Sequence, residues 1–66
     1  MLLVNDRDRV EWRYGMTVRD LLEVLGYDYA LMTVTVDGEL VPEEEYSIRT
    51  LRDGAEVVVF HLAHGG

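Results

Sequence analysis

The sequence predicts a two-layer α+β domain in which one helix packs on one face of a mixed β-sheet. Three observations predict this class: apolar residues alternate along several short segments, one capped segment has helical spacing, and an unbroken apolar run lies near the end of the chain. The 66 residues suffice for one domain and no more. Hydrophobic residues make up 48% of the chain and fall in short runs, as in a small globular protein.

The N-terminal part of the sequence predicts a β-hairpin. Residues 2–5 are expected to form a short strand, and residues 5–8 (Asn-Asp-Arg-Asp) have side chains that bond locally to the backbone in turns. Residues 9–13 alternate charged and apolar positions, which is typical of a half-buried strand. Trp12 in this segment is expected to pack in the core or at the sheet edge.

The clearest local signal is a helix over residues 18–25. Thr17 is placed to cap its N-terminus, and Asp20, three residues later, can complete a capping box and interact favourably with the helix dipole. Gly26 is expected to end the helix, because glycine adopts the left-handed conformation without steric cost. Apolar residues recur at helical spacing and give the helix one face directed at a core: Val18, Leu21, Leu22 and Leu25.

The middle of the sequence predicts another strand, over residues 31–36. Its apolar and polar positions alternate, so one face carries the side chains expected in the core: Met32, Val34 and Val36. Residues 37–38 (Asp-Gly) are a strong turn signal. Pro42 has no N–H to donate, which keeps the segment after the turn at a sheet edge or outside the ladder.

Two connecting segments have simple interpretations. Residues 27–29 contain two tyrosines, which are expected to cover the edge of the core. Residues 43–45 are three consecutive glutamates, and a solvated turn is the expected structure, with contact to arginines of a partner as the alternative.

The last part of the sequence predicts the central strand of the sheet. Residues 51–54 (Leu-Arg-Asp-Gly) are a second turn signal, and residues 56–60 end in four consecutive apolar side chains. Such a run favours a central strand with apolar surroundings on both faces. The expected organisation is therefore one domain over residues 1–60 and a flexible tail over residues 61–66.

Composition and charge argue against several classes of function. The chain has no cysteine, which excludes disulfides and thiolate chemistry. Its formal net charge of -7 makes nucleic acid an unexpected partner; it either favours a partner with a basic surface or only keeps the domain soluble. All six basic residues are arginine, so no lysine side chain is present to accept an isopeptide bond. The apolar run of residues 1–4 is too short for a signal peptide or a membrane span, so a soluble cytoplasmic protein is expected.

The tail is the segment most suited to chemistry. If extended, residues 61–66 reach about 20 Å, far enough to carry a terminal carboxylate into the active site of another protein. Gly65 and Gly66 lack a Cβ, so they can pass through a narrow channel and leave the carboxylate sterically accessible. The simpler interpretation of the two glycines alone is a frayed chain end.

Three segments together resemble the ubiquitin-like sulphur carrier family, and most of all its thiamin-pathway members. They are residues 37–42 (Asp-Gly-Glu-Leu-Val-Pro), residues 51–57 (Leu-Arg-Asp-Gly-Ala-Glu-Val) and the final pair Gly65–Gly66. The resemblance extends over nearly the whole chain, and the combination is more specific than any one segment. The departures are Ala55, where an acidic residue is common, and His64 before the two glycines.

The resemblance implies a β-grasp fold, with four to five strands and one main helix, and a carrier function. A ubiquitin-activating-type adenylating enzyme would join the Gly66 carboxylate to AMP, and a sulphur donor such as a cysteine desulphurase would convert the product to a thiocarboxylate. The thiocarboxylate would deliver sulphur to thiazole synthase in thiamin biosynthesis. The chain would then be a co-substrate and not an enzyme. It would bind no cofactor, because ATP and Mg²⁺ belong to the partner.

The expected site residues lie on the last strand and the tail. Gly66 is the reactive terminus and Gly65 supplies clearance. Phe60 either packs in the core or contacts the adenylating enzyme, as the resemblance implies, and Val58 shares its face of the strand. The complete set of expected partner-binding residues is Val58, Phe60, Leu62, His64, Gly65 and Gly66. No metal site is expected, because His61 and His64 lack an obvious third ligand.

Other functions remain open at this point. The small subunit of molybdopterin synthase also ends in Gly-Gly on a β-grasp domain and works with a large subunit, but such chains tend to be longer. A carrier for another sulphur metabolite is a further possibility. A protein modifier conjugated through Gly66 belongs to a different class, as does a plain interaction domain with an accidental diglycine.

Overall fold

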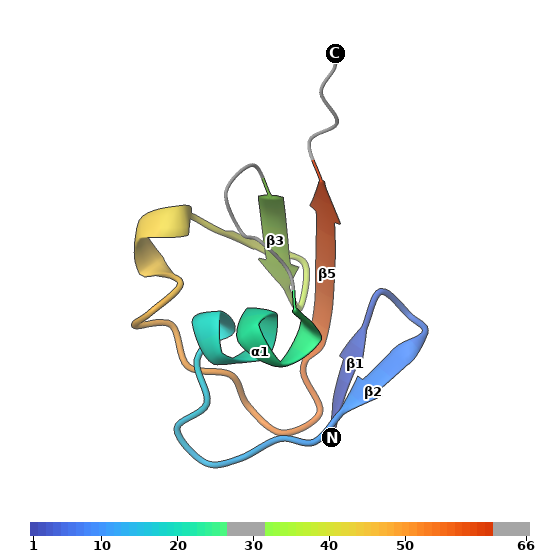
Figure 1. Cartoon of the computed structure of the whole chain (residues 1–66). Coiled ribbons are helices and arrows are strands. Elements are labelled where there is room, and N and C mark those ends of the chain that lie inside the picture. The colour runs from blue at the N-terminus through green and yellow to red at the C-terminus, as the bar shows by residue number, and fades with distance from the viewer. Residues whose placement is uncertain (27–31, 62–66) are drawn as a thin grey trace.

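The computed structural model describes residues 1–26 and 32–61, and within them five strands form one mixed sheet with an α-helix on one face (Figure 1). The predicted α+β class is confirmed. The elements are β1 (Leu2–Val4), β2 (Asp8–Val10), α1 (Val18–Leu25), β3 (Met32–Val36), β4 (Glu39–Val41), the 3₁₀ helix η1 (Glu43–Glu45) and β5 (Glu56–His61). None of the described helices is long and apolar enough to cross a membrane.

The strands follow the order β2-β1-β5-β3-β4 across the sheet. Strand β5 is parallel to β1 and antiparallel to β3, while the β1–β2 and β3–β4 pairs are antiparallel hairpins. The last strand of the chain is therefore the central one, as its apolar run predicts. It follows that the chain leaves the domain from the middle of the sheet.

The N-terminal hairpin is shorter than its sequence pattern predicts. Asn5 and Asp6 both have a φ of 56°, and this left-handed pair turns the chain from β1 into β2. Strand β2 ends at Val10, whereas alternation predicts a strand up to residue 13. Trp12 lies beyond it, packs partly buried against the core and donates from its indole Nε1 to the carbonyl oxygen of Leu51 at 2.8 Å. A tertiary contact thus takes these residues out of the ladder.

Helix α1 has the predicted bounds and the predicted caps. The Asp20 N–H donates to Thr17 Oγ1 at 3.2 Å, and the Thr17 N–H donates to Asp20 Oδ2 at 3.0 Å, which completes the capping box. Gly26 ends the helix in the left-handed region at φ 75°. The helix is therefore defined at both ends by local interactions.

The core lies between α1 and one face of the sheet. Its largest fully buried side chains come from the helix and from four strands: Leu2, Val4, Val18, Leu21, Leu22, Val34, Val41 and Val57. Strand β3 alternates as predicted, with Met32, Val34 and Val36 buried. Because the helix covers one face only, the other face of the sheet carries half-buried and exposed side chains.

The predictions for the remaining connecting segments can be compared with the structure at residues 42–45 but not at residues 27–29. Pro42 follows the last residue of β4 and stands outside the ladder, as predicted. Residues 43–45 form the single turn of η1, in which no residue is buried. The expected position of residues 27–29 over the core lies outside the described residues.

Candidate functional site

Strand β5 sets where the tail leaves the domain. It pairs with β3 through five residue pairs, from Val36↔Val57 to Met32↔His61, and with β1 through Leu3↔Glu56 and Val4↔Val57. The expected tail residues Leu62, His64, Gly65 and Gly66 lie outside the described residues, and their roles remain predictions.

The side chains of β5 alternate between the core and the open face of the sheet. Val57 and Val59 are buried under α1, whereas Val58 is 39% exposed and Phe60 is 46% exposed. The prediction of apolar surroundings on both faces of this strand was therefore wrong. The physical reason is that one short helix covers a single face of a five-stranded sheet. The alternative in which Phe60 is a core residue fails for the same reason.

Val58 and Phe60 belong to a row of side chains on this open face. Val58 lies opposite Thr35 of β3, and Thr35 lies opposite Leu40 of β4. Leu40 is 62% exposed, so an apolar side chain of β4 also lies on this face. We call Leu40, Val58 and Phe60 the open-face apolar residues. Leu40 was missed as a site residue, although its place next to the buried Val41 in a period-two pattern could have indicated it.

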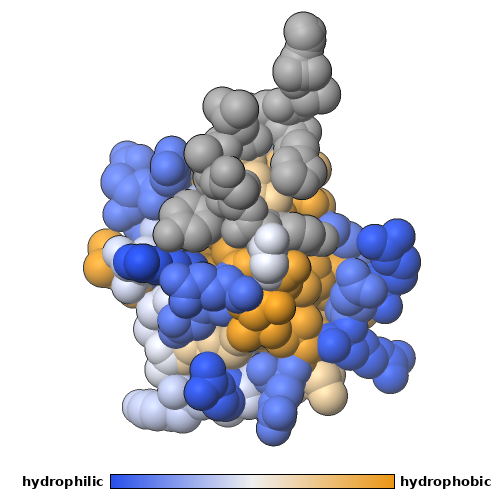
Figure 2. Space-filling view, in the orientation of Figure 1, coloured by the Kyte–Doolittle hydropathy of each residue, from blue (hydrophilic) through white to orange (hydrophobic). Residues whose placement is uncertain are grey.

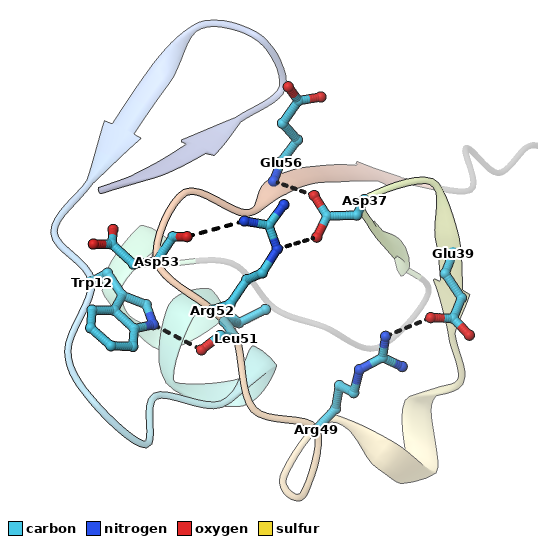
Figure 3. A network of polar contacts seen from close by, with 8 residues as sticks. All are labelled: Trp12, Asp37, Glu39, Arg49, Leu51, Arg52, Asp53 and Glu56. Carbon is cyan, nitrogen blue, oxygen red and sulfur yellow. Dashed lines mark hydrogen bonds and ion pairs between the residues drawn. The ribbon is translucent and has the colours of Figure 1, made fainter.

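The start of β5 is held by the carboxylate of Asp37 in the β3–β4 turn (Figure 3). Asp37 Oδ1 accepts the N–H of Glu56 at 3.0 Å, and Oδ2 accepts from Arg52 Nε at 3.2 Å. The Glu56 hydrogen bond and the charge of Arg52 lower the pKa of Asp37 from its ordinary value of 3.8, although desolvation opposes the shift. The carboxylate is thus stabilised as the anion that joins the turn to the strand.

The other edge of β5 is held by the side chain of Asn5. The Asn5 N–H donates to the carbonyl oxygen of Val57, and Asn5 Oδ1 accepts the N–H of Val59, both at 2.8 Å. The left-handed backbone of Asn5 turns the main chain away, so its amide oxygen occupies the place of a backbone carbonyl in the ladder. Both neighbours of β5 therefore end their pairing with a side-chain oxygen.

The helix side of the molecule has a different surface. Figure 2 shows hydrophobic side chains gathered beside α1 and bordered by hydrophilic ones. Val24 of α1 is 60% exposed, and Leu25 packs half-buried against the core. No group of three or more potential metal ligands occurs among residues 1–26 and 32–61. The described part of the chain therefore has exposed apolar side chains on both sides of the sheet and holds no metal-ligand cluster.

Comparison with known proteins gives consistent matches over the full length of the chain. The model of the ThiS family matches residues 2–66. "Sulfur carrier protein ThiS" of Escherichia coli (strain K12) is 29% identical over 65 residues, which cover 98% of this chain and 97% of the relative.

Two solved structures of a thiamine biosynthesis protein from Geobacter metallireducens have the same fold. The crystal structure, of ThiS, superposes with a TM-score of 0.79 at 30% identity and covers 98% of this chain and 97% of its own. The solution structure has a TM-score of 0.76 at 30% identity and covers 98% and 86%. The predicted β-grasp fold is thereby confirmed.

Proposed function

This chain belongs to the ThiS family, and from that premise we propose that it carries sulphur for thiamin thiazole biosynthesis on the carboxyl group of Gly66. The observation that carries the proposal is the family match over residues 2–66, which includes the diglycine. A curated relative of almost identical length is a sulphur carrier, which supports the same function. The pathway's need for ATP supports a cytoplasmic location.

The proposed chemistry has two stages at Gly66. In the first, a carboxylate oxygen attacks the α-phosphorus of ATP on a ubiquitin-activating-type adenylating enzyme, which releases pyrophosphate and leaves an acyl-adenylate. In the second, a persulphide sulphur from a donor such as a cysteine desulphurase attacks the carbonyl carbon and displaces AMP. A thiol then cleaves the resulting acyl disulphide, which leaves the thiocarboxylate on the chain and a disulphide on the donor. Adenylation is required because a free carboxylate has no adequate leaving group.

The domain provides the surface that the partner enzymes bind and the strand from which the tail extends, and the catalytic groups belong to the partners. Strand β5 fixes the point from which the tail extends, because it is hydrogen-bonded on both sides up to Val59. The open-face apolar residues beside it supply a surface for the adenylating enzyme and for thiazole synthase. Val58 and Phe60 are central to this surface, since their exposure leaves apolar area available for burial.

Intact mass spectrometry tests the proposal directly. After incubation with a cognate adenylating enzyme, ATP and a sulphur donor, the chain should gain the mass of one sulphur in place of one oxygen. A variant with one alanine appended after Gly66 is the control, because it moves the carboxylate away from the reacting position without altering the fold. An unchanged mass for the native chain, or full conversion of the extended variant, would refute carrier function.

The same measurement addresses the alternatives. Adducts in which Gly66 is joined to lysines of other proteins would support a protein modifier. Sulphur transfer to a molybdopterin synthase large subunit, in place of thiazole synthase, would assign the chain to the other carrier pathway. Reconstitution of thiazole formation with the loaded chain therefore completes the test.

A further inference from the structure

Strand β5 is longer than its pairing with β1. On the β3 side the pairing continues to Met32↔His61, but on the β1 side it ends at Val4↔Val57 and the Asn5 contacts. Beyond that point the chain turns into β2, and the end of β5 projects past the hairpin (Figure 1). The last residues of β5 thus have a neighbouring strand on one side only, within the described part of the chain.

The hydrogen bonds identify which backbone groups face the unoccupied side. The carbonyl oxygens of Ala55 and Val57 accept from β1 and Asn5, and the Val59 N–H donates to Asn5, so the odd-numbered residues face β1. Glu56 faces the other way, because its carbonyl oxygen accepts the N–H of Asp37 at 2.7 Å.

The same alternation directs the carbonyl of Val59 and the N–H of His61 toward the side that β1 has left. Neither group has a hydrogen-bond partner among the described residues. One donor and one acceptor with the spacing of a β-ladder therefore lie at the end of β5, directly before residue 62.

We propose that an extended segment of the adenylating enzyme adds to the sheet at this edge, in line with β1, and hydrogen-bonds to the Val59 carbonyl and the His61 N–H. The inference rests on the proposed function and names how the enzyme holds the start of the tail. Strand addition to an open edge is a general mode of recognition in which the main chain supplies affinity. An added strand would lie about 4.8 Å from β5, so its side chains would contact Phe60 on the open face.

Two observations favour the enzyme over other occupants. The edge adjoins the exposed side chains of Val58 and Phe60 and leads directly into the segment that must enter an active site. A second copy of this chain is the other obvious strand donor, but two molecules of net charge -7 repel each other. The edge and the open-face apolar residues thus form one continuous surface for a single partner.

The test is removal of the His61 N–H by N-methylation of the backbone. The chain suits semisynthesis, because a peptide of residues 55–66 with cysteine at position 55 can be ligated after Gly54 and desulphurised to the native alanine. Selectivity is assured, since the chain has no other cysteine. The matched control is N-methylation at Phe60, whose N–H faces β3 and not the open edge.

We expect N-methyl-His61 to unfold like the native chain and to bind the adenylating enzyme about tenfold more weakly or worse, because the methyl group removes a donor and blocks the strand. N-methyl-Phe60 should instead lower stability. In the native chain, hydrogen exchange at the His61 N–H should slow by at least about tenfold when the enzyme binds. Equal affinity of the His61 variant, or unslowed exchange, would overturn the inference.

The outcomes separate this inference from the proposed function. If the native chain is converted to the thiocarboxylate while N-methyl-His61 binds as tightly, the carrier function stands and the strand addition is wrong. If the native chain does not bind the enzyme, both are wrong. If methylation abolishes self-association of the chain without changing enzyme affinity, the edge serves a second copy and the inference is overturned.

Discussion

Two residues, Asn5 and Asp37, connect the turns of this domain to its central strand. Both have left-handed backbones, with φ values of 56° and 51°, and both offer a side-chain oxygen to a backbone N–H of β5. Asparagine and aspartate tolerate this conformation better than other residues with a side chain, and their short polar groups reach neighbouring N–H groups. Each residue thus combines a turn-forming role with a ladder contact that its neighbours cannot supply.

Asn5→Ala should lower the free energy of unfolding by about 2 kcal/mol, from a strained left-handed alanine together with the lost hydrogen bond to Val59. Asn5→Gly separates the two causes, because glycine accepts the dihedral angle but offers no side-chain oxygen. It should recover about half of the loss. Urea unfolding monitored by Trp12 fluorescence measures both variants. Equal stability of the alanine and glycine variants would show that backbone strain contributes nothing.

Stability should fall at acidic pH through two carboxylates. The pKa of Asp37 is lowered mainly by the Glu56 N–H, and that of Asp20 mainly by the Thr17 N–H. In both residues the pKa of the folded state lies below the unfolded value of 3.8. Each ionised carboxylate therefore contributes its full stabilisation above pH 3.8, and this contribution is lost as the pH falls through the lower pKa of the folded state. We expect the urea midpoint of the double variant Asp20→Asn/Asp37→Asn to decline less steeply with falling pH than the midpoint of the native chain. An unchanged slope would contradict the assignment.

Among the helices and strands, those defined by interactions between residues close in the sequence are predicted better than those that depend on contacts between distant residues. Helix α1 was predicted with its bounds, because the Thr17–Asp20 box and Gly26 act within the helix itself. Strand β2 was predicted too long, because the contact that removes Trp12 from the ladder comes from Leu51, 39 positions away. The ladder role of Asn5 depends on Val59, 54 positions away, and no local pattern contains it.

The capping box of α1 can be tested by a double-mutant cycle. Thr17→Ala should lower the free energy of unfolding by about 1 kcal/mol, because it leaves the Asp20 N–H without its side-chain acceptor. Asp20→Ala should act in the same direction. The double variant should lose less than the sum, because each residue caps the backbone of the other. Thr17→Ser keeps the hydroxyl and should remain close to native, and strict additivity of the two losses would argue against a reciprocal box.

The molecule as a whole has two unlike sides. The apolar run of β5 predicted its central position but not its half-exposed state, because the run cannot show that a single helix covers the sheet. The topology shows that the last described residues belong to the central strand of the sheet. The exposed side chains of Val58 and Phe60 lie on this strand, on the face that the helix leaves uncovered.

Phe60→Ala should weaken binding of the adenylating enzyme by about tenfold or more, because truncation of an aromatic side chain at the centre of an interface is costly. Its unfolding free energy should change by less than about 1 kcal/mol, since the side chain is already 46% exposed. Val24→Ala on the helix side is the matched control and should leave affinity unchanged. Calorimetric titration measures the affinity of both variants for the enzyme. A larger loss for Val24→Ala than for Phe60→Ala would show that the enzyme binds the helix side of the molecule.

The amino group of Met1 forms an ion pair with Asp53, close to where β5 begins. Because β1 runs parallel to β5, this group lies at the opposite end of the sheet from the last residue of β5 (Figure 1). Because the chain has no lysine, its α-amino group is the one primary amine that can react with acylating reagents. A fluorophore coupled as an activated ester should therefore attach at a single place, and the dye can follow encounters with partner enzymes without occupying the diglycine.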